Sequence, residues 1–214
     1  MDFDQNLEKI RAYFDNKLST FGATPQGVDW NSVEAHHIRF FQLMKVINDK
    51  KEFSLLDFGS GFGSFADYLL ANDYHFDRYV GFDILESMVE KGRELHQGMP
   101  QIEFTSDPDH LPDVDYSIAC GVFNIRLNAN YNQWTDFVIV SLTKMNQISH
   151  KGFAANFLTK YSDADHMRAD LYYADPCYLF DYCKTHFSKN VAVLHDYNLY
   201  DFTLLVRKFP CPKI

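Results

Sequence analysis

One short stretch, Leu55–Gly63, constrains the fold of this chain more than any other part of its sequence. Its first four residues are apolar except for Asp57, and they predict a short buried strand. Alternating glycines follow, and a helical pattern begins at Phe65. Glycine lets the backbone turn tightly and lets a ligand approach the main chain. The stretch therefore predicts a strand, a tight turn and a helix, with a ligand site at the turn.

The rest of the chain alternates between strand and helix patterns, which predicts an α/β fold with a mostly parallel, doubly wound sheet covered on both faces. The predicted strands are 53–58, 78–83, 101–105, 115–120, 153–158, 190–195 and 200–207. Only a short connection joins the last two strands, so we expect them to run antiparallel.

Residues 1–50 have a different pattern and predict a helical N-terminal cap ahead of a domain at 51–214. A first helix is expected over 3–18, and a loop over 19–30 contains Gly22, Pro25 and Gly27. A second helix should begin at Asn31, because Glu34 lies three residues on, as in a capping box. Its predicted apolar stripe is Val33, His37, Phe41, Met44 and Ile47.

Composition excludes several classes of protein. The 214 residues suffice for about one domain, and 46% of them are hydrophobic, as in a soluble globular protein. The net charge of −9 argues against a partner bound through a phosphate backbone. No apolar run approaches the length of a membrane span. The four cysteines follow no metal-binding spacing, so we expect reduced thiols, a cytoplasmic protein and no metal site.

Two kinds of ligand fit a glycine-rich turn of this type. A dinucleotide-binding turn has the pattern G-x-G-x-x-G, but Ser64 stands where its third glycine belongs, and Asp57 would repel a pyrophosphate. A cationic ligand would instead be attracted by Asp57. Asp83 ends the next predicted strand, where a carboxylate can accept hydrogen bonds from ribose hydroxyls.

The turn resembles that of the class I S-adenosylmethionine (SAM)-dependent methyltransferases. Their pattern is an acidic residue, one spacer and G-x-G-x-G, which Asp57, Gly59, Gly61 and Gly63 match in full. The resemblance covers about residues 51–210. It implies a Rossmann-like sheet of seven strands with an antiparallel last strand, SAM as cofactor and S-adenosylhomocysteine (SAH) as product.

The resemblance also implies roles for other residues around the cofactor. Ser60 lies within the turn, Asp83 and Ile84 would contact the ribose and adenine, Asp107 the adenine amino group, and Cys120 would lie near the cofactor. From the cap, Arg39 would pair with the SAM carboxylate and Trp30 would wall the pocket. The alternatives are a helix cap for Asp83, a turn residue for Asp107, a surface ion pair for Arg39 and core packing for Trp30.

The acceptor side is expected beyond the fourth and fifth strands. Asn124 and Arg126 follow the fourth strand, and Arg126 is the preferred anchor for an anionic substrate, with a solvated loop charge as the alternative. Residues 161–175 are polar, aromatic and long enough for a lid that contains Tyr173. Tyr13 is a further substrate-binding candidate from the cap, with core packing as the alternative. His37, His166 and His195 are candidate catalytic bases. Their alternatives are a core residue for His37, part of an ordinary capped helix for His166 and a hairpin end for His195.

We therefore expect methyl transfer to an oxygen or nitrogen atom of a small molecule; the resemblance implies a sugar or a related metabolite. The sequence lacks the Pro-Cys pair and the Asp/Asn-Pro-Pro-aromatic motif of nucleobase methyltransferases, so nucleic acid is not expected as a partner. A nicotinamide-dependent oxidoreductase and a non-catalytic SAM-binding regulator remain alternatives. The sequence leaves open whether the protein is a monomer or a homodimer.

Overall fold

The computed structural model describes residues 3–30, 32–48 and 50–209 of the chain. Within them, one sheet has the strand order β3-β2-β1-β4-β5-β8-β7, and a short strand β6 pairs with the end of β5. The strands are β1 (Lys51–Phe58), β2 (His75–Phe82), β3 (Ile102–Thr105), β4 (Val114–Ala119), β5 (Ser149–Thr159), β6 (Tyr173–Ala174), β7 (Asn190–Leu194) and β8 (Asp201–Arg207). Strands β1 to β5 pair in parallel, whereas β8 is antiparallel to both β5 and β7.

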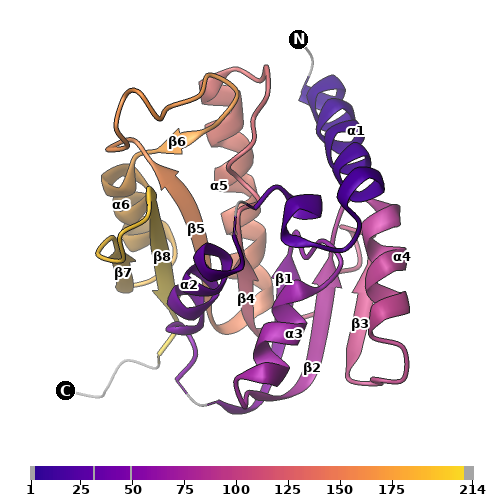
Figure 1. The fold of residues 1–214 in the computed structure, drawn as a ribbon. Coiled ribbons are helices and arrows are strands. Elements are labelled where there is room, and N and C mark those ends of the chain that lie inside the picture. Colours follow the sequence, from indigo (N-terminus) through magenta and orange to yellow (C-terminus); the bar gives the residue numbers. More distant parts are fainter. Residues whose placement is uncertain (1–2, 31, 49, 210–214) are drawn as a thin grey trace, which may run out of the picture.

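Helices cover both faces of this sheet (Figure 1). They are α1 (Phe3–Phe21), the 3₁₀ helix η1 (Pro25–Val28), α2 (Val33–Met44), α3 (Ser64–Ala71), α4 (Glu86–Leu95), α5 (Tyr131–Ile148) and α6 (Pro176–His186). In the described part of the chain, no helix combines the length and apolar character needed to cross a bilayer.

The two largest cores lie on opposite faces of the sheet, because successive strand residues point to opposite faces. On β5, Ala154 joins the core under α2, α3 and α4. Its neighbours Phe153 and Ala155 join the core under α5 and α6. The predicted α/β class, the mostly parallel sheet and the antiparallel last strand are therefore confirmed. The short strand β6 was not predicted, because two residues are too few to show a period.

The predicted apolar stripe of α2 is wrong at Val33, His37 and Phe41, which are exposed, whereas Met44 is buried as predicted. Val33 and Phe41 are 47% and 54% exposed, and the buried face instead carries His36, Arg39 and Leu43 among others. Polar His36 and Arg39 made the true buried face look mixed in the sequence. The helix is capped by Ser32, whose Oγ accepts a hydrogen bond from the Ala35 amide at 3.1 Å. The predicted start at Asn31 lies outside the described residues.

The segment before α2 lies over the glycine-rich turn. Phe14, Leu18 and Val28 pack against a small cluster of Phe62, Leu85 and Met88. Phe62 belongs to the turn and Met88 to α4, so α1 and η1 rest on the edge of the sheet where β1 and β2 end (Figure 1). The N-terminal residues thereby approach the predicted ligand site.

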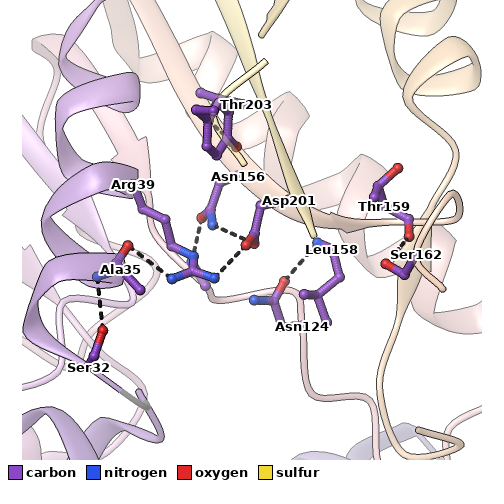
Figure 2. A network of polar contacts seen from close by, with 12 residues as sticks. Ser32, Ala35, Arg39, Asn124, Asn156, Leu158, Thr159, Ser162, Asp201 and Thr203 are labelled. Carbon is purple, nitrogen blue, oxygen red and sulfur yellow. Dashed lines mark hydrogen bonds and ion pairs between the residues drawn. The ribbon is translucent and has the colours of Figure 1, made fainter. Parts of the chain in front are cut away.

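A buried ion pair joins α2 to the sheet. The guanidinium of Arg39 donates to the carboxylate of Asp201, the first residue of β8 (Figure 2). Their side chains are 10% and 0% exposed. A buried charge that loses its partner is costly, so this contact ties the position of α2 to that of β8.

We expect Arg39→Met to lower the free energy of unfolding by about 3 kcal/mol, because Asp201 would remain as an unpaired buried charge. Adding Asp201→Asn should recover part of that loss, and urea denaturation of the single and double variants measures both. Arg78→Met is the control, because it breaks an exposed pair with Glu103 and should cost less than about 1 kcal/mol. Equal losses for Arg39→Met and the control would contradict the role of the buried pair.

Candidate functional site

The glycine-rich turn crosses the end of β2. The amides of Gly59 and Ser60 both donate to the Phe82 carbonyl, at 2.7 and 2.9 Å. Gly59, Gly61 and Gly63 have φ values of 78°, 54° and 92°, where side chains other than glycine are strained. A Cβ atom on Gly59 would also lie 2.4 Å from Val122. The predicted turn therefore needs glycine both for its backbone angles and for space.

Two buried carboxyl groups flank this turn. Asp57 accepts a hydrogen bond from the Tyr79 hydroxyl at 2.6 Å, and burial raises its pKa to about 7. Asp83 accepts from the Gly61 amide at 2.9 Å and from the Leu85 amide at 3.0 Å. Burial raises the pKa of Asp83 to about 6, against the lowering effect of these two amides.

These two carboxyl groups make the site suited to a positively charged ligand. The charge of Asp83 adds to the effect of burial in raising the pKa of Asp57. Neither is in an ion pair with another residue in the described part of the chain. A cation placed beside them would stabilise their ionised forms and would itself be stabilised.

Trp30 covers the neighbouring end of β4. A Cβ atom on Gly121 would lie 2.3 Å from the Trp30 ring, so the indole packs directly on that glycine. The guanidinium of Arg39 lies 4.4 Å from the indole centroid, and the His36 ring stacks on it at 4.9 Å. Burial, aided by the charge of Arg39, lowers the pKa of His36 to about 3, so this ring is neutral at physiological pH. Trp30 is thus held by contacts on several sides.

A polar network continues from Arg39 into the sheet (Figure 2). The Asn156 side chain donates to Asp201 at 3.3 Å and accepts from the Gly121 amide at 2.7 Å. The network therefore connects α2, β8, β5 and the turn after β4. Arg39 was predicted to pair with the SAM carboxylate, but its partner within the protein is Asp201. A bond from Arg39 to the SAM carboxylate would therefore have to come from a guanidinium N–H group that does not bind Asp201.

The predicted acceptor residues lie beyond β4 and β5. Asn124 is 8% exposed, and its side-chain oxygen accepts from the Leu158 amide at 3.3 Å. The guanidinium of Arg126 donates to the carbonyls of Leu171, Ala129 and Ala169, at 3.0, 2.7 and 2.6 Å. Arg126 therefore joins the loop after β4 to the predicted lid, an arrangement that neither a free anchor nor a solvated charge describes.

Two tyrosines were also predicted to bind substrate. Tyr173 forms part of β6, and its hydroxyl accepts from the Arg168 amide at 3.0 Å. Tyr13 lies on α1, where its ring contacts Phe14 edge-on at 5.3 Å. Burial raises the pKa of Tyr13, and Asp29 adds to that effect. Both side chains belong to segments that follow or cover the sheet edge, and their roles stay predictions.

The structure does not bring the three predicted bases together. His37 is exposed on α2 and its ring meets Tyr68 at 5.3 Å. His166 is exposed in the lid, beside the Asp165 carboxylate at 3.0 Å. His195 follows β7, with its ring 6.0 Å from that of Phe202. No ring contact or hydrogen bond joins any two of these histidines in the described part of the chain.

The remaining predicted cofactor residues differ in their surroundings. Ser60 is buried, and its hydroxyl donates to the Gly61 carbonyl at 3.2 Å. Ile84 packs against the cluster under α1. Burial raises the pKa of the Cys120 thiol, which makes it a poor nucleophile. Asp107 is exposed and accepts from the Asp109 amide at 2.9 Å, so it serves the turn role that the sequence left open.

Three residues of the site carried no signal in the sequence. Tyr79 is a buried strand residue whose hydroxyl happens to reach Asp57 from the neighbouring strand. Asn156 and Asp201 lie within predicted strands, far along the chain from Arg39. A polar residue inside an apolar strand is the only hint that such residues offer. No three His, Cys, Asp or Glu side chains converge on a metal-binding arrangement among the described residues.

Comparison with known proteins gives one close relative by sequence. The chain is 44% identical over 165 residues to "Putative methyltransferase Rv1506c" of Mycobacterium tuberculosis. This alignment covers 77% of this chain and 99% of the relative. No family model matches the chain.

Solved structures give the same fold at low sequence identity. N-methyltransferase NodS of Bradyrhizobium japonicum, in complex with SAH, has a TM-score of 0.64 at 13% identity, over 94% of this chain and 98% of that one. Magnesium protoporphyrin IX methyltransferase of Synechocystis, with bound SAH, has a TM-score of 0.62 at 14% identity, over 95% and 100%. Phosphoethanolamine N-methyltransferase 1 of Haemonchus contortus has a TM-score of 0.67 at 14% identity, over 100% and 51%.

The raised pKa of Asp57 predicts a stability that depends on pH. A buried carboxyl with a folded-state pKa near 7 stabilises the fold below its ordinary pKa of about 4, and this contribution is lost as pH rises toward 7. Asp57→Asn removes the charge but keeps an acceptor for Tyr79. We expect this variant to be more stable than the native protein by about 2 kcal/mol at pH 8, and by much less at pH 5.

Urea denaturation at the two pH values measures this difference. Asp136→Asn is the matched control, because Asp136 is exposed on α5, and it should change stability similarly at both pH values. A native protein as stable as Asp57→Asn at pH 8 would show that the Asp57 charge costs nothing in the fold.

Proposed function

Since the chain belongs to the class I SAM-dependent methyltransferases, we propose that it transfers the methyl group of SAM to an oxygen or nitrogen atom of a small molecule. The observation that carries this proposal is the glycine-rich turn between two buried carboxyl groups that lack a cationic partner in the described residues. A sugar or a related metabolite is the acceptor class that we propose. The acceptors named for the structural neighbours, such as phosphoethanolamine and magnesium protoporphyrin IX, are small molecules as well.

The residues around the turn fit SAM. Its amino group and sulfonium are cations, and the carboxyl of Asp57 is buried beside the turn without a cation to neutralise it. Asp83 uses one lone pair of each oxygen for a backbone amide, so each oxygen keeps a second one for a ribose hydroxyl. Glycines that leave no side chain over the turn let the cofactor approach the backbone.

The chain's own contribution to catalysis is positioning. Bound SAM supplies an already activated methyl group, so the protein must orient an acceptor in line with it and exclude water. Arg39 and His36 hold Trp30 against the end of β4, and in this proposal its ring walls the cofactor pocket and shields the reacting centre from solvent. The network from Arg39 to Gly121 holds that end of β4 in place.

We propose that Asn124, Arg126, Tyr173 and Tyr13 form the acceptor side. Asn124 and Arg126 lie on the loop after β4, Tyr173 lies in β6, and Tyr13 lies on the cap. A hydroxyl acceptor needs a base for its proton, and His37, His166 and His195 stay the candidates. Residues 1–50 would act as a cap over a catalytic domain of residues 51–214. A cytoplasmic location is consistent with the free thiols of Cys120, Cys177 and Cys183.

Calorimetric titration with SAH, SAM and NAD tests the cofactor. We expect SAH and SAM to bind and NAD not to bind. Asp83→Ala should weaken SAH by at least about tenfold, because two charge-assisted hydrogen bonds to the ribose are lost. Asp77→Ala is the control, since Asp77 is exposed on β2, the strand that ends just before Asp83, and this variant should bind SAH as the native protein does. Binding of NAD alone would favour the oxidoreductase instead.

The raised pKa values of Asp57 and Asp83 predict that SAM binding depends on pH. Both carboxyls bind the cofactor in their ionised form, so affinity should be highest above pH 7 and should fall as pH drops through about 7 and 6. Below pH 6 the decrease should approach about tenfold per pH unit for each group that titrates. Titrations between pH 5 and 8 measure this slope, and Asp57→Asn should reduce it. A flat profile in the native protein would remove both carboxylates from the binding site.

A further inference from the structure

A cavity lies beyond the ends of β4 and β5. It has a volume of about 540 Å³ and is formed by the loop that leads into α5 and by the lid that follows β5. Its wall includes the aromatic rings of Tyr131 and Tyr173 and the apolar side chain of Met167. A cavity of this size is within the range of small-molecule sites.

Every charged side chain in the wall of this cavity is basic. Arg126, Lys160 and Arg168 converge there, although the chain as a whole has a net charge of −9. The wall itself contains no Asp or Glu. Three cations around one cavity in an acidic protein form a local attraction for a negatively charged ligand.

The cations are oriented by partners outside the wall. Lys160 donates to the Asp175 carboxylate at 2.7 Å, and Arg168 donates to both oxygens of Asp170. Arg126 is held by three backbone carbonyls rather than by a carboxylate. Its guanidinium has five N–H groups, so two are left after these bonds. The side chains are thus pre-positioned, and two bound carboxylates leave a net charge of +1 over the three cations.

The cavity also adjoins the cap and the acceptor side of the sheet. Arg126 comes two residues after Asn124, and its carbonyl accepts from the Asn6 side chain of α1 at 3.0 Å. The hydrogen bond to Asp170 raises the pKa of Arg168, and the charge of Asp29, which lies in the cap, adds to this effect. An elongated molecule in this cavity could therefore extend toward the residues that we place around the acceptor.

We propose that this cavity binds the oxyanionic group, a carboxylate or a phosphate, of a small molecule with a ring or apolar body. The oxyanion accepts hydrogen bonds from Arg126, Lys160 and Arg168, and the body packs on Tyr131 and Tyr173. Only the identification of this molecule with the methyl acceptor rests on the proposed function.

Calorimetric titration of the full chain with three compounds that share a phenyl ring tests the site. They are benzoate, phenyl phosphate and the neutral benzyl alcohol. We expect benzoate or phenyl phosphate to bind at least about tenfold more tightly than the alcohol. Whichever of these two oxyanions binds more tightly shows whether the site prefers a carboxylate or a phosphate. Lys160→Gln and Arg168→Gln should each weaken the oxyanion by about fivefold, as suits partly exposed charge contacts. Lys184→Gln is the control, because it also removes one positive charge but lies in the last turn of α6. It should bind the oxyanion as tightly as the native chain does.

Three results would overturn the proposal. The first is no binding of either oxyanion at about 10 mM, a concentration that would fill most of a site with a Kd near 1 mM. The second is that benzyl alcohol binds as tightly as the oxyanions. The third is that the Lys160→Gln and Arg168→Gln variants bind the oxyanion as tightly as the native chain. Titration of the same samples with SAH separates this proposal from the proposed function. Binding of SAH without binding of an oxyanion would reject only the proposed oxyanion site. Binding of an oxyanion without binding of SAH would reject only the proposed cofactor. An oxyanion that is displaced by SAH would not occupy an acceptor subsite.

Discussion

The buried ion pair between Arg39 and Asp201 is the contact on which the arrangement of the site depends. It joins α2 to the first residue of β8, and through Asn156 it reaches the backbone of Gly121 at the end of β4. Arg39 also stacks on Trp30, so one guanidinium holds the aromatic cover and the strand end that it covers. Because an unpaired charge at this depth would be costly, the two halves of the pair can hardly separate in the folded state.

The same edge of the sheet carries groups that oppose folding. Burial raises the pKa values of Asp57 and Asp83, which means that their ionised forms cost stability in the absence of a cation. The glycines between them add an entropic cost, because glycine loses more conformational freedom on folding than other residues do. Such a site is understandable if a cationic ligand restores part of the lost free energy on binding, which is a common relation between stability and function. The cavity beyond β5, in contrast, is lined by the cationic side chains of Arg126, Lys160 and Arg168.

Patterns of neighbouring residues made the fold and one half of the site predictable. Strand and helix periods indicated the α/β sheet, and the spacing of Asp57, Gly59, Gly61 and Gly63 indicated the cofactor family. The prediction failed for α2, where His36 and Arg39 occupy the buried face and Phe41 is exposed. A residue pattern counts apolar side chains, and it cannot show that a polar side chain is buried because a distant partner satisfies it.

The sequence by itself determined the class of fold, the position of the glycine-rich turn and the methyltransferase family, because each depends on residues that are adjacent or regularly spaced along the chain. Only the tertiary structure decided that Arg39 pairs with Asp201, that Arg126 ties the loop after β4 to the lid, and that Lys160 and Arg168 share a cavity with it. These contacts join segments far apart in sequence. Their partners are chosen by strand order and helix packing, and no local spacing of residues records that choice.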